Sequence, residues 1–138
     1  MKTSNIKVSK FVMIITFLTG LIATILGVWA TISLGTHPQF FEGAHKLVLS
    51  WSARELGMGI GALSTVFFFK DARAYAIILL SCWIREILDF IDFFRIEDTT
   101  PTRLYLVVGI SVVLHGIAFF ISIEAIRNHN KVFIISKA

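Results

Sequence analysis

The sequence predicts an all-α integral membrane protein: a four-helix bundle, connected up-down-up-down, with both termini in the cytoplasm. Its 138 residues are 56% hydrophobic and 16% charged, whereas soluble domains carry about 25% charged residues. Four apolar runs are each long enough to cross a hydrocarbon core about 30 Å thick, which needs about 20 helical residues. None of the four alternates apolar and polar residues as a barrel strand would. These three observations favour membrane-spanning helices.

The four runs form one expected transmembrane domain over residues 1–138. The first run has no charge, and it is longer than the 7–15 residues of a signal-peptide core, which favours a retained helix. The turn at 70–73 is short, so the second and third helices are expected to be antiparallel neighbours. Residues 35–49 are too apolar for a free linker and are expected to lie at the membrane interface. The expected spans are 11–34, 50–69, 74–94 and 104–126.

Lysine and arginine placement predicts the orientation, because cytoplasmic loops carry the excess of these residues. With four spans, the two chain ends and the 70–73 turn share one side. That side carries eight basic residues: Lys2, Lys7, Lys10, Lys70, Arg73, Arg127, Lys131 and Lys137. The opposite side carries three: Lys46, Arg95 and Arg103. Both termini are therefore expected in the cytoplasm.

Several function classes are disfavoured by the same sequence. The net charge of +4 does not indicate nucleic-acid binding, because the basic residues sit at the ends of apolar runs. Cys82 is the sole cysteine, so no intramolecular disulfide can form. No nucleotide-binding or protease motif is present. His115 has no second histidine or cysteine at ligand spacing, so we expect neither a metal nor a cofactor.

Charged residues concentrate in the third run, where a membrane would make them costly unless they face the bundle interior and pair. Arg85 and Asp89 are spaced i, i+4, and Asp92 and Cys82 continue the same helical stripe. Glu86 lies about 100° around the helix, beside that stripe, following from 3.6 residues per turn. This face of the third helix is expected to provide the catalytic or ligand-binding residues.

The second run supplies a matching face. Arg54 recurs with Gly57 and Gly61 at three- and four-residue spacing, and small residues permit close helix approach in membranes. The fuller run Gly57-Met58-Gly59-Ile60-Gly61 makes the helix small on two sides. Counting depth at 1.5 Å per residue places Arg54 level with Asp89, and Glu55 within reach of Arg85. We therefore expect ion pairs between these two helices.

The fourth run adds a histidine near the membrane midplane. His115 and Ser111 lie on a small, polar stripe of that run, so His115 is expected to form the floor of a pocket in the outer half of the bundle. The residues expected to contact a ligand there are Trp51, Met58, Asp92 and Ser111.

The charge balance in this region suggests acid–base chemistry. Two arginines, Arg54 and Arg85, face four carboxyl groups, so at least one carboxyl is expected to stay protonated near neutral pH. Such a group is a candidate general acid, and the arginines could hold a developing oxyanion. The candidate acids are Glu55, Glu86 and Asp89, and His115 joins the candidate catalytic residues.

A structural interpretation stays open beside the chemical one. The charges could cancel and fix helix register, since pairing is the usual fate of intramembrane charges. Glu86 and Asp92 could instead extend to the headgroups. His115 could be a neutral imidazole bonded to a neighbouring helix, as polar side chains often are in membranes.

A family resemblance adds to this picture. Ala53-Arg54-Glu55-Leu56-Gly57-Met58-Gly59, the acidic third run and the histidine of the fourth resemble the DoxX-like group of small four-helix membrane proteins. The resemblance covers most of the chain and implies the four-helix fold and a polar site near helices two and three. It implies no reaction, and Arg85 and Glu86 depart from its pattern.

Three functions are consistent with these features. The leading hypothesis is a multi-pass membrane protein that binds a lipophilic small molecule and transforms it by isomerisation or cyclisation. The alternative is a proton-coupled exporter acting as a homodimer, although the first run lacks the carboxylate that small multidrug exporters use. The second alternative is a non-catalytic membrane subunit or assembly factor. The expected partners are the lipid bilayer, a lipophilic ligand and a second copy of the chain, with no nucleic acid.

Overall fold

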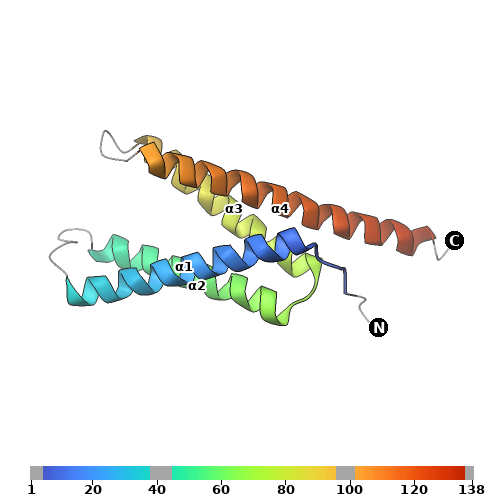
Figure 1. The fold of residues 1–138 in the computed structure, drawn as a ribbon, viewed down its shortest axis with the longest axis horizontal. Helices are drawn as coiled ribbons and strands as arrows, with labels where there is room; N and C mark the ends of the chain where they lie inside the picture. Colours follow the sequence, from blue (N-terminus) through green and yellow to red (C-terminus); the bar gives the residue numbers. More distant parts are fainter. Residues whose placement is uncertain (1–4, 38–44, 96–101, 136–138) are drawn as a thin grey trace.

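The computed structural model describes residues 5–37, 45–95 and 102–135, and every regular element in these ranges is an α-helix. The four helices are α1 (Lys10–Thr36), α2 (His45–Phe68), α3 (Ala72–Arg95) and α4 (Thr102–Ile135). They run alternately up and down, so α1 begins and α4 ends at the same end of the molecule as the turn between α2 and α3 (Figure 1). The predicted all-α class and helix order are confirmed.

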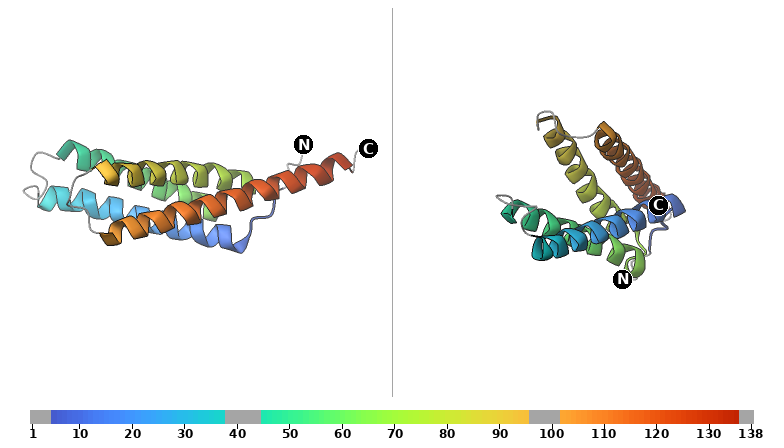
Figure 2. Two further views of the ribbon diagram at one scale, coloured as in Figure 1. Left: turned by 90° about the horizontal axis from the view of Figure 1, so that it is seen from above. Right: turned by 60° about the vertical axis from the view of Figure 1, so that its left-hand side comes forward.

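The helix bounds differ from the predicted spans at two places. α2 begins at His45, so the last five residues of the expected 35–49 interface segment belong to this helix, and residues 38–44 lie outside the described part. α4 continues to Ile135, nine residues past the expected end, because no proline or glycine interrupts residues 127–135. Its last turns extend beyond the other helices (Figure 2).

The helices pack as two antiparallel pairs, α1 with α2 and α3 with α4. The two pairs meet at the end that holds the α2–α3 turn and diverge toward the opposite end (Figures 1 and 2). At the joined end, Val12, Tyr75, Leu79 and Ala118 form a buried cluster from three helices. Ile6 ties the chain start to the turn, because its backbone NH donates to Asp71 and its carbonyl accepts from the Ala72 NH. At the opposite end, which we call the open end, α1 and α4 lie apart.

The α1–α2 contact depends on residues without large side chains. A Cβ built on Gly59 of α2 would lie 2.6 Å from the backbone nitrogen of Thr24 in α1. A Cβ on Gly27 of α1 would lie 2.9 Å from the backbone nitrogen of Leu56. Real Cβ atoms do not approach so closely, so the two backbones touch only because these positions are glycines.

The predicted close approach at the glycines of α2 is therefore wrong at Gly57. A Cβ on Gly57 would meet nothing within 4 Å, while one on Gly61 would lie 3.3 Å from Ile78 of α3. The contact that needs glycine is at Gly59, on the side facing α1, because α1 offers its own stripe of buried small residues there. That stripe follows four- and three-residue spacing along α1: Thr16, Gly20, Ala23, Gly27 and Ala30.

Within the described part of the chain, two helices are long and apolar enough to cross a membrane, α1 over Lys10–Thr36 and α4 over Leu106–Val132. Charged residues within α2 and α3 lower the hydropathy of these helices. The structure thus supports two of the four predicted spans by length and composition.

Candidate ion cluster and cavity

Arg85 of α3 lies at the centre of a group of charged side chains. Its Nη1 donates to Glu55 Oε2 of α2 at 2.8 Å. Its Nη2 donates to Oε1 of Glu86, the next residue in the chain. Its Nε lies 3.8 Å from Asp89 Oδ2. The Arg85 side chain is 11% exposed, so this guanidinium is compensated by carboxylates within the protein. The predicted pairing of Glu55 with Arg85 is confirmed.

Arg54 of α2 completes the group at its edge. Its Nη2 donates to both oxygens of Asp89, at 3.2 and 3.3 Å, and lies 3.7 Å from Glu55 Oε1. The predicted contact between Arg54 and the carboxylates of α3 is confirmed. The Arg54 side chain is 42% exposed, so this pair lies at the rim and is not fully buried. We call Arg54, Glu55, Arg85, Glu86 and Asp89 the ion cluster.

Glu86 does not extend toward the lipid headgroups, which was one of the two positions expected for it. It is 7% exposed and pairs with Arg85, so its side chain turns into the bundle. Although Glu86 is offset by about 100° around the helix from Arg85, the two side chains still pair, because the long Arg85 side chain extends across the helix surface to Glu86. Cys82 is buried on the same stripe, as expected. Asp92 belongs to α3, but its side chain lies outside the described residues.

His115 of α4 is held at both ring nitrogens. Nδ1 lies 2.8 Å from the backbone carbonyl oxygen of Ser111 and 3.2 Å from the hydroxyl of the same residue, and Nδ1 can bond to the carbonyl only in the tautomer in which it carries the hydrogen. Nε2 lies 2.7 Å from the hydroxyl of Thr19 in α1. That hydroxyl also lies 2.8 Å from the carbonyl oxygen of Ile15. His115 is therefore bonded to a neighbouring helix, as the structural interpretation expected.

The single hydrogen of the Thr19 hydroxyl allows two charge states of His115. When the ring is neutral, Thr19 donates to Nε2. When the ring is protonated, Nε2 donates to Thr19, and Thr19 donates to the Ile15 carbonyl. Neither arrangement requires a heavy atom to move, although Thr19 donates to the Ile15 carbonyl only when the ring is protonated. His115 can thus gain or lose a proton in place.

One cavity of about 430 Å³ connects the ion cluster to His115. Its polar floor consists of Glu55, Arg85, Glu86, Asp89 and His115. Its walls come from the apolar sides of α1 and α4, which include Leu18, Ile22, Leu26, Val107 and Ile110. These wall residues are exposed, and α1 and α4 have few mutual contacts, so the cavity opens between these two helices.

Most of the predicted site residues share this cavity. Trp51 and Ser111 line it together with the five floor residues. Met58 does not line it, and its sulfur lies 3.9 Å from Arg85 Nη1, behind the floor. Arg54 does not line the cavity but pairs with two of its floor residues, Asp89 and Glu55. Among the described side chains, the expected pocket residues are therefore brought together except Met58 and Arg54, and the expected contact of Asp92 is not tested.

Sequence reasoning missed the contribution of α1. Thr19 fixes the His115 ring, and Leu18 and Ile22 form one wall of the cavity. Thr19 is one of four threonines in the first run, and the hydroxyl of each of the four lies within hydrogen-bonding distance of the carbonyl four residues earlier, so the sequence alone does not single it out. The wall residues carry no signal either, because they look like any lipid-facing aliphatic residue.

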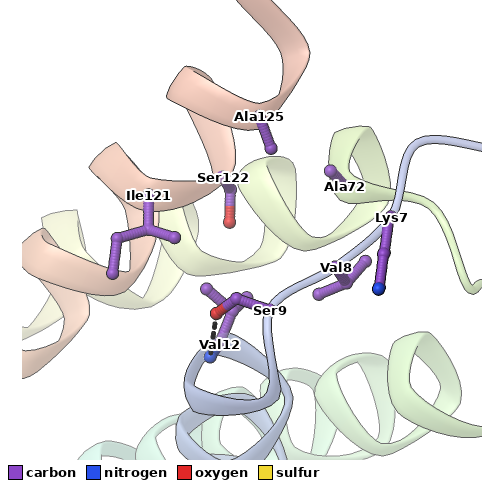
Figure 3. A pocket seen from close by; sticks show the side chains of 8 residues that line it. All are labelled: Lys7, Val8, Ser9, Val12, Ala72, Ile121, Ser122 and Ala125. Carbon is purple, nitrogen blue, oxygen red and sulfur yellow. Dashed lines mark hydrogen bonds between the residues drawn. The ribbon is translucent and has the colours of Figure 1, made fainter. Parts of the chain in front are cut away.

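A second cavity of about 280 Å³ lies at the joined end, between the start of the chain, α3 and α4 (Figure 3). Its hydroxyl groups are already bonded: Ser9 Oγ accepts from the Val12 NH, and Ser122 Oγ donates to the Ala118 carbonyl. Lys7 is its one charged lining residue. This cavity offers little chemistry to a ligand.

Fold and site together define a small four-helix protein with charges inside and apolar side chains outside. The chain matches no protein-family model, no curated protein and no solved structure. The resemblance to the DoxX-like group therefore stays a prediction from the residues.

Proposed function

We propose that this protein is a multi-pass membrane protein that binds a lipophilic small molecule in the cavity and transforms it by acid–base chemistry. The distribution of its side chains supports a bilayer environment. Large apolar residues on the outer surfaces of all four helices are exposed, among them Ile25, Ile60, Ile77 and Val113. The ion cluster lies inside. A soluble protein shows the opposite arrangement, and extended exposed apolar surfaces mark contact with lipid or partners.

The observation that carries the proposal is a ligand-sized cavity with an ionic floor and aliphatic walls. Its volume falls within the range of about 300–1,000 Å³ typical of small-molecule sites, which combine apolar linings with a few converging polar groups. The opening between α1 and α4 faces the surface that would contact lipid. A hydrophobic ligand could thus enter sideways from the bilayer and place its polar end on the floor.

The floor provides the groups that proton transfer needs. A carboxyl among Glu55, Glu86 and Asp89 that holds a proton could protonate an alkene, epoxide or carbonyl. Arg85, at the centre of the floor, could stabilise an oxyanion that develops on the ligand. His115 can accept or return a proton without movement of its neighbours. Isomerisation or cyclisation of an apolar substrate requires no more than these steps.

Filling the cavity provides the test. Leu114 lines it, whereas the adjacent Val113 is 58% exposed and does not line it. We would purify wild type, Leu114→Trp and Val113→Trp in nanodiscs and identify co-purifying small molecules by mass spectrometry. A molecule that is enriched with wild type and Val113→Trp but lost from Leu114→Trp supports the binding site. Equal retention by all three proteins would refute it.

The chemical half of the proposal needs its own variant. Once a co-purifying molecule is identified, Glu86→Gln saturated with it should convert the bound molecule about 10²–10⁴-fold more slowly, which is the typical contribution of a general acid. Conversion at the wild-type rate by the single variants at Glu55, Glu86 and Asp89 would exclude these carboxyls as the acid and favour the structural interpretation.

A further inference from the structure

The charges around the cavity do not balance. Two guanidinium groups, Arg54 and Arg85, face three carboxyl groups, Glu55, Glu86 and Asp89, among the described side chains. With every group ionised and His115 neutral, the floor carries one excess negative charge. An uncompensated charge away from water is costly, so the site favours one additional positive charge.

Glu86 is the carboxyl with spare capacity. It is nine-tenths buried, it lines the cavity, and within the described part of the chain it pairs with Arg85 through Oε1. An ionised carboxylate has about four acceptor positions on its two oxygens. By contrast, Glu55 contacts both arginines, and Asp89 receives two hydrogen bonds from Arg54. The excess charge is thus concentrated beside the cavity, where a ligand would meet Glu86.

We infer that the cavity selects an amphiphile whose polar end carries one positive charge, such as a long-chain amine or quaternary ammonium compound. The inference rests on the binding half of the proposed function and adds the charge of the ligand. The cationic end would lie against Glu86 on the floor, and the hydrocarbon would lie between α1 and α4. Among the described lining residues the walls are uncharged, and the one lining cation, Arg85, is already paired with Glu55 and Glu86.

The groups that face the floor also predict a dependence on pH. α2 contributes Arg54 and Glu55, α3 contributes Cys82 with the remainder of the ion cluster, α4 contributes His115, and α1 contributes the uncharged Thr19. A proton taken up by a carboxyl or by His115 cancels the same excess charge that the cation would cancel. The preference for a cationic ligand should therefore weaken as the pH falls and these groups take up protons.

Three probes with the same tail test the inference: dodecyltrimethylammonium, dodecanol and dodecyl sulfate. Binding to the protein in nanodiscs is measured by calorimetry, with empty nanodiscs subtracted. We expect wild type to bind the cationic probe at least about tenfold more tightly than the other two, equivalent to 1.4 kcal/mol. Glu86→Gln should remove the preference. Glu124→Gln, which changes an exposed carboxylate of α4 outside the cavity lining, should keep it.

The outcomes separate the two proposals. Equal binding of the three probes to wild type, or an unchanged preference in both Glu86→Gln and Glu55→Gln, would overturn the charge inference and leave the cavity as a ligand site. Using two glutamate variants keeps the test valid if one of them fails to fold. Absence of binding of every probe, together with unaltered co-purification in Leu114→Trp, would refute the proposed function itself.

Discussion

Replacing Arg85 by methionine tests whether the ion cluster is held together at its centre. The substitution keeps an unbranched side chain but removes the charge that faces Glu55 and Glu86. At 2.8 Å, the pair with Glu55 has a gross Coulomb attraction of about 6 kcal/mol with an effective dielectric constant of about 20. Desolvation offsets much of this energy. Breaking one side of a buried pair nevertheless costs about 3–5 kcal/mol, because Glu86 would lose its cationic partner among the described side chains, whereas Glu55 would keep Arg54.

The assay is unfolding by sodium dodecyl sulfate in mixed micelles, followed by tryptophan fluorescence. We expect Arg85→Met to lower the free energy of unfolding by about 3–5 kcal/mol. Arg54→Met should cost about 1 kcal/mol or less, because its side chain is 42% exposed at the rim. Lys131→Met, at an exposed position of α4, serves as the control and should change stability by no more than about 0.5 kcal/mol.

The double variant Arg85→Met/Glu55→Gln completes the cycle. Removing both partners leaves fewer uncompensated charges, so the combined loss should be smaller than the sum of the two single losses by about 0.5–3 kcal/mol. Strictly additive losses would show that the 2.8 Å contact carries no coupling energy. Equal losses for Arg54→Met and Arg85→Met would contradict the assignment of Arg85 to the centre and Arg54 to the rim.

Three further predictions concern packing, the histidine and topology. Gly59→Ala should destabilise the fold by about 1–3 kcal/mol in the same unfolding assay, because its Cβ would meet the α1 backbone, whereas Gly57→Ala should be neutral or stabilising by up to about 1 kcal/mol; the reverse order would contradict the α1–α2 contact. His115→Gln should keep the fold, because glutamine still forms hydrogen bonds, but should abolish any pH dependence of ligand binding that arises from the ring; an identical pH profile would assign that dependence to the carboxyls. In a Cys82→Ser background, a cysteine at Thr99 should react with an impermeant maleimide from the non-cytoplasmic side, and labelling from the cytoplasm would reverse the predicted orientation.

The sequence was sufficient to predict the four helices, their order and the ion pairs between α2 and α3. Hydropathy and helical spacing are local properties, and Arg54 and Asp89 could be matched by counting depth along two antiparallel helices. The Gly57 assignment failed because the rotation of α2 is set by the stripe of small residues on α1, which only the packed pair reveals. Glu86 lies in the cluster as one of the predicted candidate acids, and of the two positions left open for it, the one at the headgroups is not adopted, because Glu86 pairs with Arg85.

The cavity itself was less predictable than its floor. Charged residues within apolar runs are recognisable as candidate site residues from the sequence, because each needs a partner inside the protein. Leu18, Ile22 and Val107 carry no such mark, and whether they face lipid or a ligand depends on the angle between the two helix pairs. That angle is set by contacts at the joined end, many residues away from the cavity walls.

The division of the bundle into two helix pairs separates the residues that maintain the fold from those that would choose the ligand. The α1–α2 seam tolerates little change, since Gly20, Gly27 and Gly59 have no room for a side chain. The walls on α1 and α4 touch few partners across the gap, so exchanging Ile22 or Val107 for another aliphatic residue alters the shape of the cavity at little cost in packing. The same frame could therefore be adapted to ligands of different length or bulk by substitutions on these two surfaces, without redesign of the seams.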